Sequence, residues 1–229
     1  MALIADTCVV IPAFNEGRVL SGVLADLTRL PHAVVVVDDG SDDDTGRRAT
    51  EYPVVVLRHF VNLGQGAALQ TGIEYALAIP GIRFIVTFDA DGQHTVDDIE
   101  RLLAPLRAST HDVVLGSRFL ARAEAAGIRP SRVTLLKAAA WFTRLTTGLR
   151  LTDTHSGLRA LTAEAAAALR IRQNRMAHAS EILAQIAALK LRYCEVPIRV
   201  RYTPYSVRKG QSALNGINIL WDIMKEKMR

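Results

Sequence analysis

Two aspartates close an apolar run near the middle of the chain, and their spacing indicates metal chemistry. Asp89 and Asp91 follow residues 82–88, whose composition is typical of a buried strand. Side chains alternate along a strand, so both carboxylates should point to the same side. Two close carboxylates repel each other unless a cation or hydrogen-bond donors lie between them. Oxygen ligands favour Mg²⁺ or Mn²⁺, which commonly bind through one or two carboxylates and substrate phosphates. The segment therefore predicts a metal–diphosphate site.

The same segment has a simpler interpretation as a polar turn that leads into a helix. Thr95 can cap such a helix, and Asp97 and Asp98 would then lie in its first turn. A helix N-terminus favours both a capping hydroxyl and negative charge. This segment alone does not decide between the metal site and the capped turn.

Acidic residues also follow two other predicted strands. Glu16 comes shortly after residues 7–11, and Asp38 and Asp39 follow residues 33–37. The carboxyl ends of parallel strands meet at one edge of a sheet, so we expect all five carboxylates to lie together there. Carboxylates accept hydrogen bonds from ribose hydroxyls and base N–H groups, and this edge therefore suits a nucleoside. Asp-Asp-Gly-Ser is equally typical of a helix cap, so both interpretations stay open.

Two glycines precede a helix predicted at residues 66–79. Gly64 and Gly66 would let the backbone approach a ligand, and the following helix N-terminus favours an anion. A Gly-x-Gly pair is also common in ordinary turns. No Gly-x-Gly-x-x-Gly follows the first strand, which argues against a dinucleotide-dependent oxidoreductase.

The elements that would position these residues alternate between strand and helix. This alternation predicts a three-layer α/β fold with a mainly parallel central sheet. Strands are expected at 7–11, 33–37, 54–57, 82–88 and 112–116, with strand character at 191–202 broken by Pro197. Helices are expected around 19–30, from a Ser41 cap to about 50, and at 66–79, 95–107, 131–147, 163–169 and 179–189. We expect one domain with a nucleotide half (1–127), an acceptor half (128–211) and a C-terminal amphipathic helix (212–229).

Composition restricts the class of protein. The chain is 49% hydrophobic and 22% charged, as in packed globular proteins. A net charge of +5 suits anionic partners, but no basic patch is interleaved with aromatics, which argues against nucleic acid. Cys8 and Cys194 lie in apolar runs and are expected to be buried thiols, consistent with a cytoplasmic location. We expect no signal peptide and no spanning helix, since no apolar stretch approaches about 18 residues.

Several ordered motifs together resemble one enzyme family. They are IPAFNE at 11–16, VDDGS at 37–41, NLGQGAA at 62–68, DADGQH at 89–94, GSR at 116–118, DTHSGLR at 153–159, EVP at 195–197 and RKGQS at 208–212. In this order they resemble the inverting glycosyltransferases of family 2, above all dolichyl- and polyprenyl-phosphate mannose and glucose synthases. The resemblance covers about residues 7–212 and implies a GT-A-type, Rossmann-like α/β/α fold.

The resemblance also implies a role for individual residues. Those expected to bind the donor nucleotide are Pro12, Ala13, Glu16, Asp38, Asp39, Gly66 and Asp89. Those expected to hold Mg²⁺ or Mn²⁺ on the diphosphate are Asp91 and Gln93. Those expected on the acceptor and phosphate side are Arg118, Ser156, Arg208 and Lys209, the last two on a mobile loop. The catalytic set implied in this way is Asp91, Arg118 and Asp153.

The expected chemistry depends on the acceptor. The leaving nucleoside diphosphate develops negative charge, which a divalent ion and Arg or Lys donors can stabilise. A polyprenyl phosphate is already anionic near neutral pH and needs no strong base, whereas a hydroxyl acceptor does. Asp153 is our candidate for that base, although a capping or acceptor-orienting role fits it equally. His94, His155 and His178 are weaker candidates, because lone histidines are more often structural.

Two features set the chain apart from many relatives. Gln65 and Gln211 stand where many relatives have lysine, although Lys209 can compensate for one lost charge. Many relatives continue into spanning helices, whereas here an amphipathic segment ends the sequence. Its apolar face is formed by Leu214, Ile217, Leu220, Trp221, Met224 and Met228. Such a basic helix suits a membrane interface, or else it packs on its own domain or on a partner.

The sequence thus predicts a metal-dependent inverting transferase that moves a hexose, mannose or glucose, from a nucleotide-diphospho-sugar to a polyprenyl or dolichyl phosphate. We expect it to be peripheral on the inner face of the membrane, where a membrane-protein partner is possible. The alternatives are a transferase acting on a saccharide or small-molecule hydroxyl, and a nucleotide-sugar-binding subunit of a membrane complex. The nucleotide base, the sugar and the acceptor do not follow from these motifs.

Overall fold

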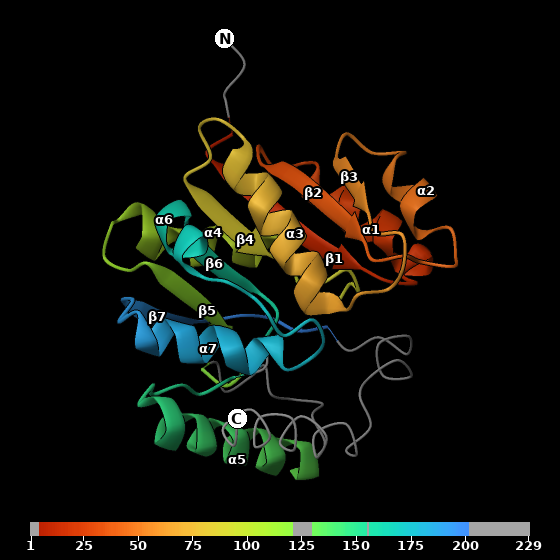
Figure 1. The fold of residues 1–229 in the computed structure, drawn as a ribbon. Helices are drawn as coiled ribbons and strands as arrows, with labels where there is room; N and C mark the ends of the chain where they lie inside the picture. The colour runs from red at the N-terminus through yellow and green to blue at the C-terminus, as the bar shows by residue number, and fades with distance from the viewer. Residues whose placement is uncertain (1–4, 121–129, 155, 202–229) are drawn as a thin grey trace.

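A single seven-stranded sheet forms the centre of the computed structural model, which describes residues 5–120, 130–154 and 156–201 (Figure 1). The strand order is β3-β2-β1-β4-β6-β5-β7. The strands are β1 (Thr7–Ala13), β2 (Ala33–Asp38), β3 (Val55–Arg58), β4 (Phe84–Thr87), β5 (Val113–Ser117), β6 (Arg159–Thr162) and β7 (Tyr193–Pro197). All neighbouring strands are parallel except where β6 pairs antiparallel with β4 and β5.

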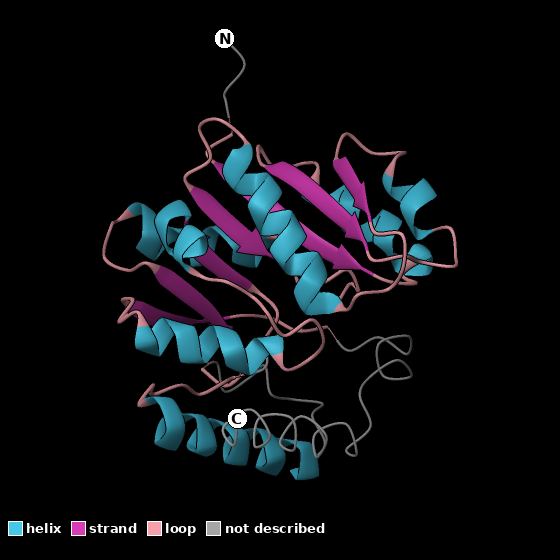
Figure 2. Ribbon diagram, in the orientation of Figure 1, coloured by secondary structure: helices cyan, strands magenta, loops and turns pink. Residues whose placement is uncertain are grey.

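Helices cover both faces of this sheet (Figures 1 and 2). They are α1 (Gly17–Leu27), α2 (Thr45–Ala49), α3 (Gln65–Ala78), α4 (Asp97–Arg107), α5 (Pro130–Thr147), α6 (Ala163–Ala168) and α7 (His178–Ala188). One core packs α1, α2 and α4 against the sheet, and the other packs α3, α6 and α7 against the opposite face. Helix α5 lies outside, beside α7. The predicted three-layer α/β architecture is confirmed.

The helices bury the stripes that their sequences predict. In α1, Leu20, Val23, Leu24 and Leu27 recur at helical spacing and are all buried. The mainly parallel strands are buried from both sides, as in residues 34–37 of β2, so they are continuously apolar rather than alternating. Because β1 pairs parallel with both β2 and β4, the carboxyl ends of these three strands lie at one edge of the sheet.

Pro12 lies inside a central strand without disrupting it. Strand β1 pairs with β4 only from Thr7 to Val10, and continues beside β2 as far as Ala13. Proline cannot donate a ladder hydrogen bond, so it is tolerated where one neighbouring ladder has already ended. The same overhang brings the loop after β1 to the edge where the acidic residues collect.

Three local expectations were wrong. Strand β6 was not expected, because its four residues follow a Gly-Leu turn and are too few for a clear period. Ser41 does not cap α2, which begins at Thr45; its hydroxyl instead accepts a hydrogen bond from the Asn15 N–H at 3.0 Å. Helix α4 begins at Asp97 without a side-chain cap, and the Thr95 hydroxyl donates to Asp98 Oδ2 at 2.8 Å.

Other expectations concern residues beyond those described. Arg208, Lys209 and the amphipathic helix at 212–229 lie outside the described ranges, as does His155. The boundary proposed near residue 127 also falls in a segment outside them, so the division into halves stays a prediction. Among the described helices, none combines the length and apolarity that crossing a bilayer requires.

Candidate functional site

Three carboxylates gather at the carboxyl ends of β1 and β4. Burial, followed by the neighbouring charge of Asp89, raises the pKa of Asp91 to about 6, and the charge of Glu16 acts in the same direction. Glu16 is buried immediately before α1, where its backbone N–H donates to Thr45 Oγ1 at 2.9 Å. The structure therefore brings Glu16, Asp89 and Asp91 within electrostatic range of one another, as the strand ends predicted.

The carboxylate of Asp89 is held from several sides. Gln65 Nε2 donates to Asp89 Oδ1 at 3.0 Å, and His94 Nε2 lies 3.2 Å from Oδ2. A Cβ at Gly157 would overlap this carboxylate, so glycine is needed there to admit it. Burial acts to raise the pKa of Asp89, but the hydrogen bond and charge of His94, with the charge of Arg159, lower it overall. Asp89 is thus fixed as an anion.

Asp91 and Gln93 form the loop that we expected to hold a metal. The Gln93 N–H donates to Asp91 Oδ1 at 3.0 Å, and the Gln93 carbonyl accepts from Arg201 N at 2.8 Å. Burial first, and then the charge of Asp89, raise the pKa of Asp91, and a bound cation would favour its ionised form against both effects. Within the described ranges, no three His, Cys, Asp or Glu side chains form a cluster that could hold a metal. These donors therefore fit a hard cation whose coordination is completed by substrate phosphates.

Asp38 and Asp39 hold the loops at the same edge of the sheet. Asp39 accepts from the N–H groups of Leu63 at 3.0 Å and Gly64 at 2.7 Å, and lies 2.6 Å from His59 Nδ1. Asp38 is fully buried and accepts from the Ser41 N–H at 3.0 Å. Gln65, the residue after Gly64, contacts Asp89, so Asp39 and Asp89 hold consecutive residues of one segment.

The donor-nucleotide assignments within this edge stay predictions. Pro12 and Ala13 are buried, and the Ala13 carbonyl accepts from the Asp39 N–H at 2.8 Å. Asp38 is 0% exposed and Asp39 is 2% exposed, so the described contacts of both carboxylates are structural. Any contribution of these two residues to nucleoside binding would act through the shape of the loops that they hold.

Gly66 is glycine for a different reason from the one expected. The Gly66 N–H donates to the Asn174 carbonyl at 2.8 Å, and a Cβ at Gly66 would overlap the Gln173 carbonyl. The close approach predicted for a ligand is thus made by the chain's own segment before α7. Gly64 has a φ of 108°, a conformation that favours glycine, and meets the same segment. The expected anion-binding space at Gly66 is therefore filled by backbone.

A buried ion pair occupies the other side of the site. Arg118 Nε donates to Asp153 Oδ2 at 2.6 Å, and Arg118 Nη2 donates to Oδ1 at 2.7 Å. The side chains are 9% and 0% exposed. Both carboxylate oxygens are therefore engaged, an arrangement that suits Asp153 to orient Arg118 rather than to take a proton. Ser156 is buried nearby in sequence, where its hydroxyl accepts from the Leu158 N–H at 3.3 Å.

Glu195 supports this ion pair from β7. Its carboxylate accepts from the N–H groups of Thr152 at 2.8 Å and Asp153 at 3.0 Å. Burial raises the pKa of Glu195, and the backbone hydrogen bond from Asp153 opposes this rise. The sequence placed Glu195 in a motif but gave it no role, because the pairing of β7 with β5 that brings it here was not predicted.

Two histidines and one arginine lie close to these carboxylates. His178 is buried at the start of α7, its Nδ1–H donates to the Arg175 carbonyl at 2.7 Å, and burial lowers its pKa to about 4. The ring of His94 packs edge-on against Phe88, with 5.7 Å between the centroids. Arg159 is 3% exposed. The sequence did not identify Arg159 because strand β6 was not predicted. The pairing of Arg159 with Thr87 places both side chains on the same face of the sheet.

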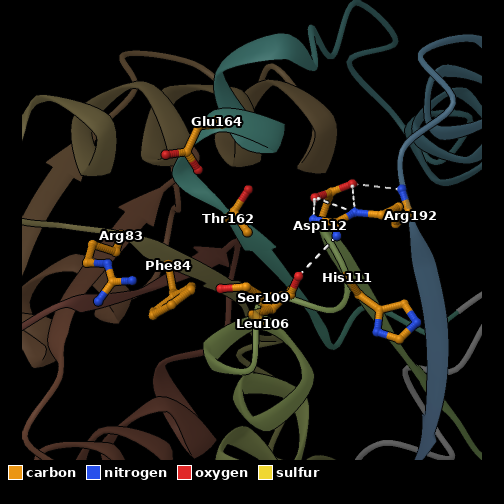
Figure 3. A pocket seen from close by; sticks show the side chains of 9 residues that line it. All are labelled: Arg83, Phe84, Leu106, Ser109, His111, Asp112, Thr162, Glu164 and Arg192. Carbon is orange, nitrogen blue, oxygen red and sulfur yellow. Dashed lines mark hydrogen bonds and ion pairs between the residues drawn. The ribbon is translucent and has the colours of Figure 1, made fainter.

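A separate hollow of about 340 Å³ lies at the opposite ends of the strands (Figure 3). Its lining includes Phe84, the first residue of β4, and Asp112, immediately before β5. Figure 3 shows Asp112 bonded to Arg192, whose Nη2 donates to Asp112 Oδ1 at 2.6 Å. Because the hollow lies at the amino ends of β4 and β5, it is separate from the edge that holds Asp89 and Asp91.

The chain is similar to known proteins both in sequence and in fold. Residues 8–167 match the family described as Glycosyl transferase family 2. The chain is 31% identical to the UDP-N-acetylglucosamine–dolichyl-phosphate N-acetylglucosaminyltransferase of Methanococcus voltae, over 96% of this chain and 95% of that protein. It is 34% identical to the undecaprenyl-phosphate mannosyltransferase of Micrococcus luteus, over 90% and 86%. The fold is shared with glucosyl-3-phosphoglycerate synthase of Mycobacterium tuberculosis, with TM-score 0.68, 20% identity, and 96% and 80% of the two chains covered.

Proposed function

Because this chain belongs to glycosyltransferase family 2, we propose that it transfers a hexose from a nucleotide-diphospho-sugar to a polyprenyl or dolichyl phosphate, with inversion and with a divalent metal. The observation that carries the proposal is the asymmetry of the site. Glu16, Asp89 and Asp91 form an acidic edge, and Asp153 presents Arg118 beside it. An acidic edge suits a metal-bound donor, whereas an oriented arginine suits an anionic acceptor.

The donor side is supported by the Asp91 loop. Asp91 and Gln93 would hold Mg²⁺ or Mn²⁺, and the bound ion would neutralise the charge that develops on the leaving diphosphate. Asp89 would remain an anion held by Gln65 and His94 and would bind the nucleotide side. The solved glucosyl-3-phosphoglycerate synthase of similar fold was crystallised with Mn²⁺ and uridine diphosphate, which is consistent with this assignment.

The acceptor side favours a phosphate over a hydroxyl. A hydroxyl acceptor needs a base, but both oxygens of Asp153, the candidate base, accept hydrogen bonds from Arg118. A phosphate acceptor needs only positioning and neutralisation of charge, which a fixed guanidinium provides. Relatives named for dolichyl phosphate and undecaprenyl phosphate support the same choice.

The end of the described chain supports a role for the basic segment that follows. Val200 forms a bridge with His94, and Arg201 is bonded to Gln93, so this part of the chain leaves the metal loop directly. Arg208 and Lys209 lie a few residues further on, and we propose that they contact the phosphates. Attachment of residues 212–229 to the inner face of a membrane, or to a membrane protein, completes the proposal.

The proposal is tested first by donor binding. Thermal melting of the full chain is measured with UDP-, GDP- and dTDP-linked glucose, mannose and N-acetylglucosamine, with and without MnCl₂. A ligand that binds the folded state raises the melting temperature, so one nucleotide should stand out and should require the metal. If none raises it, the donor assignment fails.

The reaction is then tested with the donor that binds. Radiolabelled sugar should enter an organic-extractable product with a short polyprenyl phosphate, and should not do so with the matching free polyprenol. Transfer to the polyprenol or to a saccharide instead would favour the hydroxyl-directed alternative. Donor binding with neither transfer nor hydrolysis would favour a nucleotide-sugar-binding subunit.

A further inference from the structure

The proposed mechanism does not use one buried arginine, Arg159. This residue lies close to both the donor-side carboxylates and the Arg118–Asp153 pair. Arg159 opens β6, where it pairs with Thr87 of β4 and with Leu115 of β5. Alternation along β6 puts Arg159 on the same face as Leu161, which packs in the core of α3, α6 and α7. Asp89 follows Thr87 by two residues at the end of β4, so the register directs Arg159 toward the acidic edge.

One nitrogen of the buried Arg159 guanidinium lacks a hydrogen-bond partner within the described part of the chain. Its residue is 3% exposed, and its Nη1 makes no hydrogen bond among residues 5–120, 130–154 and 156–201. Burying a charge is costly, and an unpaired buried donor adds to the cost. A hydrophobic residue of similar volume would stabilise a core at least as well, so stability alone does not explain an arginine here.

The charges around Arg159 come from both sides of the site. Burial lowers the pKa of Arg159, and the charges of Asp89 and Asp153 oppose this shift. Asp153 is already bonded to Arg118, and Asp89 is already bonded to Gln65. Arg159 is therefore a buried cation within electrostatic range of both the donor-side carboxylate and the acceptor-side pair.

We propose that Arg159 is a positioning residue whose buried guanidinium fixes the carboxylate of Asp89 relative to the Arg118–Asp153 pair, so that donor and acceptor groups are held in register. This inference rests on the proposed function. Arg159 acts through Asp89 and Asp153 rather than by touching a ligand, because its Nη1 is enclosed. Gly157, two residues before Arg159, leaves room for the Asp89 carboxylate and serves the same arrangement.

The test uses Arg159→Met, which removes the charge at similar length, and Arg159→Lys, which keeps the charge but not the planar fork. The probe is whichever of UDP, GDP and dTDP, with MnCl₂, raises the melting temperature of the unmodified full chain most. Calorimetric titration should show binding weakened about 30-fold or more in Arg159→Met and by an intermediate factor in Arg159→Lys. The matched control is Arg83→Met, at the opposite end of β4, with unchanged binding.

A double-mutant cycle separates positioning from folding. If Arg159 acts through Asp89, Arg159→Met should weaken nucleotide binding by no more than about threefold in an Asp89→Asn background, because contacting residues are not additive. Equal effects of Arg159→Met in both backgrounds would overturn the inference, as would binding by Arg159→Met within threefold of the unmodified protein. Should Arg159→Met not fold, Arg159→Lys decides: weaker binding with an intact melting transition supports positioning, and unchanged binding overturns it.

The outcome for the proposed function is distinguishable. If none of the three nucleotides binds the unmodified chain with Mn²⁺, the proposed function fails before any variant is compared. If one binds and Arg159→Met behaves like Arg83→Met, the proposed function stands and only the role of Arg159 is withdrawn.

Discussion

The two sides of the candidate site, the Arg118–Asp153 pair and the carboxylates at the end of β4, differ in how their buried charges are stabilised. At the Arg118–Asp153 pair, both oxygens of the carboxylate accept from the guanidinium, and the charges cancel within the protein. At the end of β4, Asp91 lies beside Asp89 and Glu16, and burial with this like charge raises its pKa to about 6. One side is neutralised by the fold itself, and on the other side burial and the charge of Asp89 disfavour the ionised form of Asp91.

This difference indicates that the carboxylates at the end of β4 are the side that would bind a cation. A bound metal ion would favour the ionised form of the buried Asp91, whereas a closed ion pair gains nothing from one. The closed pair has a different use, since it holds an arginine in one orientation next to the acidic edge. The acidic side should therefore respond to metal and pH, and the ion-paired side should respond to loss of either partner.

The largest expected effect on stability comes from opening the ion pair. Asp153→Ala removes the carboxylate that forms the ion pair with the buried Arg118 and should lower the free energy of unfolding by about 3–5 kcal/mol. Chemical denaturation of the metal-free protein measures this. The matched truncation on the other side, Asp91→Ala, should cost far less because it removes a repelled charge. Equal losses of unfolding free energy in Asp153→Ala and Asp91→Ala would contradict the difference between the two sides.

The largest expected effect on function comes from the acidic side. Asp91→Asn keeps the shape of the side chain but weakens the metal ligand, so transfer should fall by about 100-fold or more, as for loss of one group that stabilises transition-state charge. The metal-dependent part of the thermal shift should also disappear. Asp112→Asn, in the hollow at the other ends of the strands, serves as the control. A metal-dependent shift that survives in Asp91→Asn would refute the assignment of this ligand.

The pH dependence of stability should differ between the two sides. The pKa of Asp91 is raised to about 6 in the folded state, above the value of about 3.9 in an unfolded chain, so the folded state holds this proton more tightly. The contribution of Asp91 to stability is therefore fully present below about pH 4 and is lost as the pH rises through about 6. Melting of the metal-free protein at pH 5 and pH 7.5 measures this loss.

Two comparisons make the pH measurement specific. The loss between the two pH values should be smaller in Asp91→Asn, which cannot ionise at this position. It should also shrink when MnCl₂ is present, because the ion stabilises the ionised form. A pH profile that is the same in the variant and in the unmodified protein would contradict the pKa shift.

The sequence predicted what depends on local pattern. Burial on both faces makes the parallel strands continuously apolar, so their carboxyl ends, and with them Glu16, Asp89 and Asp91, could be placed at one edge from spacing alone. The three-layer fold followed from the alternation of strand and helix. The motifs also pointed to the family that the comparisons then showed.

What the sequence did not predict depends on pairing across long distances. Strand β6 has four residues and exists because it fits antiparallel between β4 and β5, a property of the assembled sheet rather than of its own sequence. Arg159 was missed with it. Gly66 was assigned to a ligand because nothing local shows that the segment before α7, more than one hundred residues away in sequence, fills that space. Tertiary contacts decided each of these cases.

The smallest expected effect concerns Gln65, the uncharged residue that donates a hydrogen bond to Asp89 on the acidic side. Gln65 donates one hydrogen bond to Asp89 at 3.0 Å, so Gln65→Met should weaken nucleotide binding only about fivefold, the equivalent of about 1 kcal/mol for one hydrogen bond. Gln65→Glu should weaken it considerably more, because it adds a further negative charge beside Asp89. Calorimetric titration with MnCl₂ and the best-bound nucleoside diphosphate measures both. If Gln65→Glu bound as well as the unmodified chain, the acidic side would not be limited by its charge, and the contrast with the closed Arg118–Asp153 pair would lose its physical basis.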